Sequence, residues 1–195
     1  MARTKRLSDE TVLDAALELI HRRGPDALTF GSLSEASGLS PATLVQRFQD
    51  KPKLMQAALL RAWEGLDRKT AQLADELPKT PEGAVTLLVG LSGSYGGIED
   101  YAEGLLVLRE DFRDPVLRER GARWKAQLGK ALDACFAGMS SAPNGIGLLM
   151  ASQWQGSLLW WAFEPTQRLD VYVEKGLRAF VEAVVPRFQK TADRR

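Results

Sequence analysis

The sequence contains very little of the chemistry that enzymes and metal sites commonly use, with one cysteine and one histidine in 195 residues. Cys135 has no partner for an intrachain disulfide, and no CxxC pair or Cys/His cluster with zinc spacing is present, so we expect no disulfide and no structural metal. His21 stands alone, which excludes the HExxH arrangement, and its place beside Arg22 and Arg23 is typical of a helix end rather than of a catalytic base. The segment SGSYG at 92–96 lacks the first glycine of a GxSxG elbow and follows no strand. We therefore expect no enzyme and no cofactor.

Net charge is also nearly absent, because 26 Lys+Arg balance 25 Asp+Glu. Any basic surface for nucleic acid must therefore be local. The start, MARTKRLSDE, is basic but has no apolar region behind it, so we do not expect a secretory signal. Together with the single cysteine, this favours a cytoplasmic location. Carboxylates between residues 99 and 114 could in principle form an acidic pair, but we interpret them as a solvated helix face: Glu99, Asp100, Glu103, Glu110, Asp111 and Asp114.

One long segment lacks charge altogether. Residues 134–163 contain no Asp, Glu, Lys or Arg and are long enough to span a bilayer. Ser152, Gln153, Gln155 and Ser157 interrupt the segment, and it lacks a basic flank. It therefore predicts a helix buried in a protein core or subunit interface rather than a membrane span.

Strand patterns are nearly absent, whereas apolar residues recur at helical spacing from end to end, so the fold class is predicted to be all-α with about nine helices. We expect a small three-helix domain at 1–53 and a larger helical bundle at 54–195, joined by a long fourth helix over 51–77. The expected later helices cover 84–94, 98–109, 115–137, 145–163 and 166–188, separated by glycine- and proline-containing breaks.

The stretch GSLSEASGLSPATLVQRF, residues 31–48, predicts two short helices joined by a tight turn. Thr29 can cap a helix over 30–37, and Gly38 permits a positive φ in the turn. Ser40 can then cap a second helix whose first residue is Pro41. This is the helix-turn-helix arrangement that inserts its second helix into a DNA major groove.

If Leu44 and Phe48 face the core, the opposite face of the second helix presents small and polar side chains. Gln can pair with adenine, and the methyl groups of Ala and Thr suit thymine, which predicts some A·T content in the site. Helix N-termini and basic side chains would contact phosphates, and the N-terminal arm would reach a minor groove or else remain a solvated tail. The candidate DNA contacts are Thr29, Ser40, Ala42, Thr43, Gln46, Arg47, Lys51, Arg3, Lys5 and Arg6.

From Thr11 to about Leu60 the sequence resembles the N-terminal domain of TetR-family transcriptional regulators. The resemblance rests on RRGPDALTF followed by LSEASGLSPATLVQRFQDKPKLMQAAL, with Thr29, Gly38, the Thr43-Leu44 pair, Phe48 and a Lys-x-x-Leu start to the fourth helix. The chain departs from the family where an aromatic residue is common and it has Val45, and where Ala is common and it has Ser34. Val45 removes a candidate phosphate-binding hydroxyl, which affects expected affinity rather than fold.

The resemblance implies a homodimeric repressor that binds a palindromic operator and is released when its C-terminal bundle binds a small, largely apolar effector. Candidate ligand contacts combine large apolar groups with polar ones: Tyr95, Leu106, Arg109, Trp124, Leu128, Met150, Trp154 and Leu158. Residues of these types are more often ordinary core than ligand contacts. Candidate dimer contacts lie in the last two helices: Gly156, Leu159, Trp160, Phe163, Val173, Leu177, Phe180, Val181 and Val184. The alternative is a helical homodimeric interaction protein whose DNA-binding head is weakened.

Overall fold

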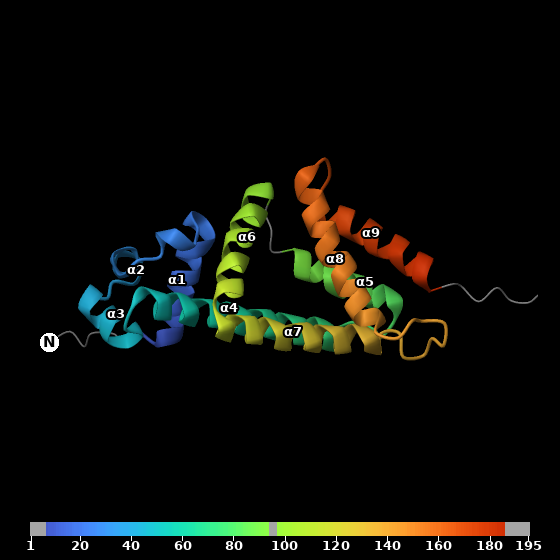
Figure 1. Ribbon diagram of the computed structural model, residues 1–195, viewed down its shortest axis with the longest axis horizontal. Helices are drawn as coiled ribbons and strands as arrows, with labels where there is room; N and C mark the ends of the chain where they lie inside the picture. Colours follow the sequence, from blue (N-terminus) through green and yellow to red (C-terminus); the bar gives the residue numbers. More distant parts are fainter. Residues whose placement is uncertain (1–6, 94–96, 186–195) are drawn as a thin grey trace, which may run out of the picture. The chain divides into compact units, whose positions relative to one another are not determined.

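A computed structural model describes residues 7–93 and 97–185. The arm residues Arg3, Lys5 and Arg6 and the ligand candidate Tyr95 lie outside these ranges. Within them the regular structure consists of helices, which confirms the predicted all-α class (Figure 1). The elements are α1 (Asp9–Arg23), a 3₁₀ turn η1 (Pro25–Ala27), α2 (Phe30–Ser37), α3 (Pro41–Phe48), α4 (Lys51–Glu76), α5 (Pro81–Ser92), α6 (Ile98–Arg113), α7 (Pro115–Ala134), α8 (Ile146–Phe163) and α9 (Leu169–Val184).

The chain divides into two compact units. The first contains Met1–Arg68 and Gly96–Trp124, and the second contains Lys69–Tyr95 and Lys125–Arg195. The boundaries therefore fall inside the long helices α4 and α7, which each contribute to both units. The functional boundary expected at residues 53/54 stays a prediction.

In the first unit, α1, α2 and α3 form a small cluster with the start of α4 (Figure 1). Ser8 begins α1 by accepting a hydrogen bond from the Thr11 amide, and acidic residues occupy the positive first turn of that helix. One apolar stripe of α1 is buried, as its spacing predicts. The shared core consists of Val12, Ala16, Ile20, Leu28, Leu33, Leu44, Phe48, Leu54, Ala58, Leu59 and Leu117.

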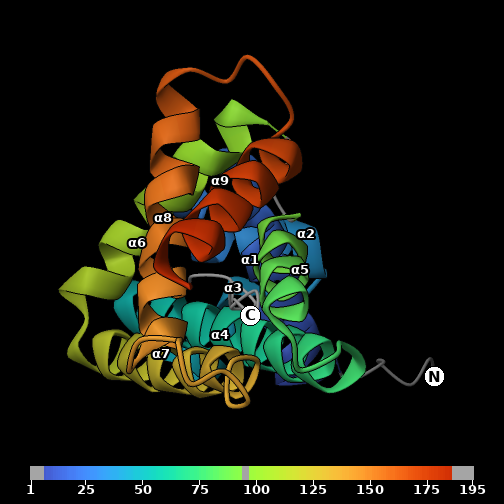
Figure 2. The same ribbon diagram turned by 90° about the vertical axis from the view of Figure 1, so that its right-hand side faces the viewer.

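In the second unit, α9 packs against both α5 and α8 (Figure 2). The position that a Cβ would occupy on Gly176 of α9 lies 3.2 Å from the Ser157 hydroxyl oxygen of α8, so small residues permit this close approach. The indole of Trp154 donates to the Ser92 hydroxyl over 2.7 Å, which links α8 to α5. The uncharged segment at 134–163 thus contains a helix, α8, whose one face belongs to the core of the second unit. Among the described residues, no helix is long and apolar enough to cross a membrane.

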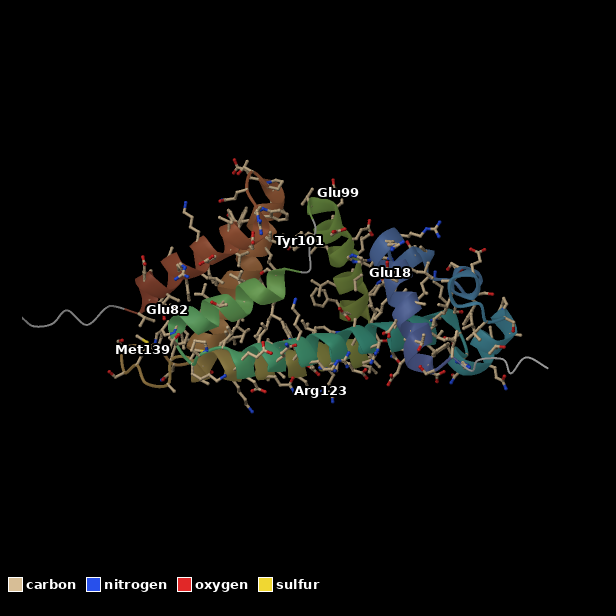
Figure 3. The ribbon with its side chains drawn as sticks, turned by 180° about the vertical axis from the view of Figure 1, so that it is seen from behind. Glu18, Glu82, Glu99, Tyr101, Arg123 and Met139 are labelled. Carbon is tan, nitrogen blue, oxygen red and sulfur yellow. The ribbon has the colours of Figure 1, made fainter. Side chains whose placement is uncertain are left out.

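Within this single chain only one face of α8 is buried, so the predicted subunit interface on its other face stays a prediction. Leu148, Leu149, Leu159, Trp160 and Phe163 are exposed, so the outer face of the helix remains apolar and uncovered in this single chain. By contrast, charged side chains such as Glu18, Glu82 and Arg123 occupy the exposed faces of their helices, in the ordinary way (Figure 3).

Some helix ends differ from the predicted ones because a proline or a cap decides them. Helix α6 continues to Arg113 rather than Arg109, and only Asp114 separates it from Pro115. The residue before a proline is pushed out of the helical region, and Asp114 has an extended ψ of 122°. Its carboxylate then accepts from the amides of Val116 and Leu117 and so caps α7.

Candidate nucleic-acid interface

Helix α2 begins with a reciprocal cap built from two hydroxyl side chains. The Ser32 amide donates to the Thr29 hydroxyl oxygen over 3.0 Å, and the Thr29 amide donates to the Ser32 hydroxyl oxygen over 3.0 Å. Ser32 also donates to the carbonyl of Ala27 over 2.7 Å. Thr29 therefore caps the helix as its sequence position predicts, and Ser32 completes a capping box in place of the usual Glu or Gln.

The turn between α2 and α3 depends on a left-handed residue. Gly38 has φ 72° and ψ 7°, a conformation that favours glycine, and its amide donates to the Ser34 carbonyl. The Ser34 hydroxyl donates to the carbonyl of Leu39 over 2.7 Å. Ser34, where the family commonly has Ala, thus adds a hydrogen bond that closes the turn.

Helix α3 presents one buried and one exposed face, as predicted. Ser40 accepts from the Thr43 amide over 3.2 Å, and Pro41 occupies the first helical position, where an amide is not needed. Leu44 is fully buried and Phe48 is 8% exposed, which anchors the helix to the core.

The exposed face of α3 is formed by Ala42, Val45 and Gln46. Thr43 is half-buried, and its hydroxyl oxygen lies 2.9 Å from that of Ser40. The outward surface is therefore small and polar apart from Val45, which is 45% exposed. Such a surface can enter a major groove, and Gln46 can donate and accept hydrogen bonds at base edges.

The two predicted basic phosphate contacts in the described domain are both engaged within the chain. Arg47 donates from Nη1 to the Leu7 carbonyl over 2.9 Å and to Asp9 Oδ1 over 3.1 Å. Lys51 donates from Nζ to the Asp26 carbonyl over 3.3 Å. Both side chains hold neighbouring segments of this domain together.

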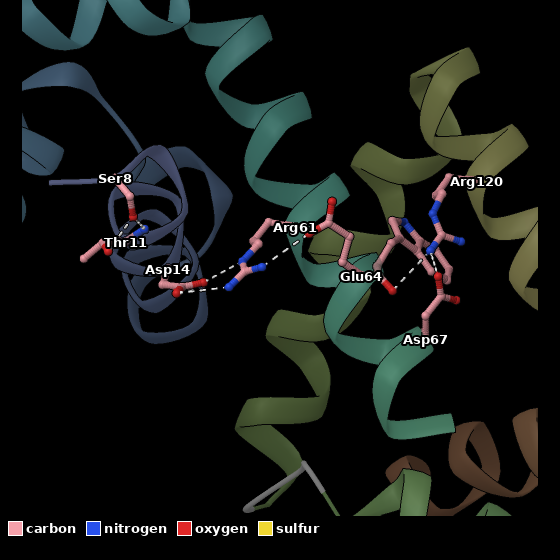
Figure 4. A network of polar contacts seen from close by, with 8 residues as sticks. Ser8, Thr11, Asp14, Arg61, Glu64, Asp67 and Arg120 are labelled. Carbon is pink, nitrogen blue, oxygen red and sulfur yellow. Dashed lines mark hydrogen bonds and ion pairs between the residues drawn. The ribbon is translucent and has the colours of Figure 1, made fainter. Parts of the chain in front are cut away.

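A further ion pair fastens α4 to α1. Arg61 Nε donates to Asp14 Oδ1 over 2.9 Å, and its Nη1 lies 3.3 Å from Glu64 Oε2 (Figure 4). The hydrogen bond to Asp14 raises the pKa of Arg61, so this guanidinium stays charged. Two Arg-carboxylate ion pairs, Arg47–Asp9 and Arg61–Asp14, therefore join α3 and α4 to α1.

A buried polar cluster between α4, α6 and α7 was missed by the sequence analysis. Trp63 Nε1 donates to Asp111 Oδ1 over 3.0 Å, and the ring centroids of Trp63 and Trp124 lie 5.7 Å apart. Arg120 lies over the Trp63 ring and pairs with Asp67 (Figure 4). Asp111 is only 8% exposed, so assigning it to a solvated face was wrong. Asp111 lies in a run of charged residues and its donor Trp63 belongs to another helix, so the local sequence carried no signal for this burial.

The predicted ligand contacts are distributed over both units. Leu106 and Arg109 are exposed on α6 and Trp124 is buried in α7, all in the first unit. The remaining described candidates are core residues of the second unit: Leu128, Met150, Trp154 and Leu158.

The predicted dimer contacts separate into an outer and an inner set. On α8, Gly156 is partly exposed, and Leu159, Trp160 and Phe163 are exposed by 44%, 66% and 76%. On α9, Val173 and Leu177 are fully buried within the chain's own core. The others are partly buried: Phe180, Val181 and Val184.

Two short capped helices around a left-handed turn, with the second exposing a polar face, define a helix-turn-helix DNA-binding domain. Residues 12–58 match the family model described as bacterial regulatory proteins, tetR family. The N-terminal segment of the chain is therefore a TetR-family domain, which confirms the resemblance seen in its sequence.

Solved structures with a similar fold cover most of the chain at low identity. EbrR, a multidrug binding protein complexed with malachite green, is 21% identical, with a TM-score of 0.67 over 93% of this chain and 100% of its own. PfmR, a TetR family regulator from Thermus thermophilus, is 18% identical, with a TM-score of 0.56 over 92% of this chain and 99% of its own. A transcriptional regulator from Rhodococcus sp. Rha1 is 12% identical, with a TM-score of 0.72 over 90% of this chain and 97% of its own. These likenesses establish the fold. No curated protein matches the sequence.

Proposed function

We propose that the chain is a transcriptional repressor that binds a palindromic DNA operator as a homodimer and leaves it when a small, largely apolar effector binds the C-terminal bundle. The observation that carries this proposal is α3, a capped helix with two buried anchors and an exposed polar face within a TetR-family domain. The role consists of binding and involves no catalytic step.

Base readout is assigned to the exposed face of α3. Gln46 lies opposite the buried Leu44 and Phe48 at about 100° per residue, and Ala42 and Val45 provide methyl groups on one side of it. A glutamine amide pairs bidentately with adenine, and methyl groups pack on the thymine methyl. The operator half-site should therefore contain an A·T pair opposite Gln46.

The effector role rests on the fold. EbrR, which shares this fold, has been crystallised with malachite green, an aromatic compound. In the present chain, α8 carries Met150, Trp154 and Leu158 along its buried face. An apolar effector would bind among side chains of this kind and favour one arrangement of the two DNA-reading heads.

The test is selection of genomic DNA fragments by the purified protein, followed by affinity measurements on the recovered sequence. A palindrome with half-sites about one helical turn apart is expected. Affinity should fall steeply as salt is raised, because phosphate contacts release counterions.

A single substitution then tests α3. Gln46→Ala should weaken binding to the recovered site by about 1–3 kcal/mol and lower discrimination at one base pair. Gln72→Ala, at an exposed position on α4 in the second unit, is the matched control and should leave affinity unchanged.

Two outcomes would contradict the proposal. If Gln46→Ala binds every site variant as the parent protein does, α3 does not read bases through Gln46. If no sequence is enriched and duplex affinity does not depend on salt, the interaction-protein alternative replaces the regulator.

A further inference from the structure

Arg47 lies in the last turn of α3, yet both of its described polar contacts are to the start of α1. Nη1 donates to the Leu7 carbonyl over 2.9 Å and to Asp9 Oδ1 over 3.1 Å. The side chain is only 19% exposed, whereas that of Asp9 is 66% exposed. Leu7, Ser8, Asp9 and Arg47 together line a shallow open depression on the surface. The guanidinium is therefore committed to this contact rather than extended into solvent.

The Leu7 carbonyl is a notable acceptor because of its place in the chain. It precedes Ser8, the N-cap of α1, and directly follows the sequence ARTKR, in which Arg3, Lys5 and Arg6 carry three positive charges. A hydrogen bond to this carbonyl fixes the point at which the basic segment joins the folded domain. The bond comes from the helix that would enter the major groove, so the joining point is fixed relative to α3 itself.

We infer that Arg47 is a positioning residue for DNA binding: it holds the Leu7 end of the basic N-terminal segment beside α3, and contributes to affinity through Arg3, Lys5 and Arg6 rather than through its own phosphate contact. The inference rests on the proposed DNA-binding function. It is an alternative to the assignment of Arg47 as a phosphate clamp. The Leu7 carbonyl and the Asp9 carboxylate occupy the two donors on Nη1, whereas Nε and Nη2 keep the other three, so the two roles have to be separated by experiment.

A double-mutant cycle separates the two roles. Arg47→Met keeps the apolar stem and removes all five donors. It is measured in the parent chain and in a chain carrying Arg3→Gln, Lys5→Gln and Arg6→Gln, using the operator recovered by genomic selection. Thermal unfolding of each variant confirms that the domain is folded.

If Arg47 acts through the basic segment, Arg47→Met raises Kd about fivefold or more in the parent chain and less than about twofold in the neutralised chain. The slope of log Kd against log salt should fall in the first background only. An equal loss in both backgrounds would show a direct phosphate contact and overturn the inference, as would no loss in either.

Arg61→Met is the matched control. Arg61 also forms an ion pair with α1, through Asp14, and its side chain is 18% exposed, almost the same as Arg47. It contacts neither α3 nor Leu7. Arg61→Met should therefore lower stability without changing the operator affinity of the folded protein.

A readout without DNA keeps the inference separate from the proposed function. Trypsin cleavage after Arg6 requires the Leu7–Asp9 segment to open, so Arg47→Met should accelerate that cleavage about threefold or more relative to the parent and to Arg61→Met. Unchanged cleavage overturns the inference even if DNA binds. Failure of the parent chain to bind any fragment overturns the proposed function and the affinity role of Arg47, while accelerated cleavage would still support the contact with Leu7.

Discussion

At the scale of single residues, Asp111 is the least expected feature. Its carboxylate is buried, and the hydrogen-bond donor described for it is the indole of Trp63 rather than a cation. Burial raises the pKa of Asp111, the Trp63 hydrogen bond opposes this, and the charge of Asp114 adds to the increase. The folded chain therefore binds a proton at this site more tightly than the unfolded chain does. Above the raised pKa, the buried charge lowers the stability of the protein.

Asp111→Asn should accordingly stabilise the protein at pH 7, because the amide keeps an oxygen for Trp63 and removes the buried charge. The gain is the free energy that the folded chain loses by keeping this carboxylate ionised and buried. The gain should shrink as pH falls through the raised pKa and vanish near the ordinary aspartate value of about 3.9, because the parent carboxyl is then protonated. Urea denaturation at several pH values measures it.

Asp75→Asn, at an exposed position near the end of α4, controls for the loss of one negative charge from the chain. A decrease in stability of Asp111→Asn at pH 7 would contradict this account. It would mean that the ionised carboxylate gains more from Trp63 than it loses by burial.

Gln49 has a backbone conformation that lowers the stability of the folded chain. It lies between α3 and α4 with φ 67° and ψ −73°, and the Asp50 amide donates to the Phe48 carbonyl over 2.8 Å, which makes a γ-turn. A positive φ in a non-glycine residue costs about 1–3 kcal/mol. Glycine adopts it freely but loses about 0.5–1 kcal/mol more conformational entropy on folding.

Gln49→Gly should therefore raise the free energy of unfolding by about 1 kcal/mol, the balance of these two effects. Gln49→Ala retains the strain and should stay within about 0.5 kcal/mol of the parent. Chemical denaturation compares the three proteins. Equal destabilisation by Gly and Ala would show that the Gln49 side chain, rather than its backbone, determines stability at this turn.

At the scale of elements, the contact between α7 and α8 depends on one glycine. A Cβ on Gly147 would lie 2.2 Å from the carbonyl oxygen of Gly129 and 2.8 Å from the amide nitrogen of Asp133. The Gly147 amide also donates to Asp133 Oδ1 over 2.7 Å. Backbone atoms cannot move aside as a flexible side chain can, so a methyl group here must separate the two helices.

Gly147→Ala should lower stability by about 2–3 kcal/mol, at the upper end of the usual cost of overpacking. Gly129→Ala is the control, since nothing lies within 4 Å of its Cβ position, and alanine there should add up to about 1 kcal/mol through helix propensity. Thermal and urea unfolding report both. If both variants change stability with the same sign, the close approach of α8 to Gly129 is not the reason that a side chain at residue 147 is destabilising.

Whether a feature could be predicted from the sequence depends on whether its interaction partners are near to it or distant from it in the chain. Thr29, Gly38 and Ser40 act on backbone groups within a few residues, so their roles as caps and turn former follow from local rules. Leu44 and Phe48 follow from helical spacing. These local roles as caps, turn and buried anchors are confirmed, whereas the contacts of this region with DNA stay predictions.

Features that depend on distant partners could not be predicted in this way. Arg47 looked like a free cation because its acceptors lie about 40 residues earlier in the chain. Asp111 looked solvated because its donor, Trp63, belongs to another helix.

At the scale of the whole molecule, the outer face of α8 exposes several large apolar side chains. Trp160 and Phe163 are 66% and 76% exposed, and their ring centroids lie 5.9 Å apart. Leu148 and Leu159 extend the same surface along the helix. Exposed aromatic and aliphatic groups that share one helix face are typical of protein interfaces, and a two-fold axis would pair the face with itself.

The proposed homodimer therefore predicts a specific effect of charge on this face. Trp160→Glu should leave the fold of one chain intact, because the side chain is mostly exposed, and should place two carboxylates near each other across the two-fold axis. The parent protein should show twice the 21.5 kDa chain mass in light scattering, and the variant should show the chain mass. Loss of the linked second head should weaken binding to a palindrome about 10²-fold or more. Phe112→Glu, at another exposed aromatic position on α6, should remain dimeric. A dimeric Trp160→Glu protein with parental operator affinity would exclude α8 as the interface, since a charged pair buried there could not be tolerated.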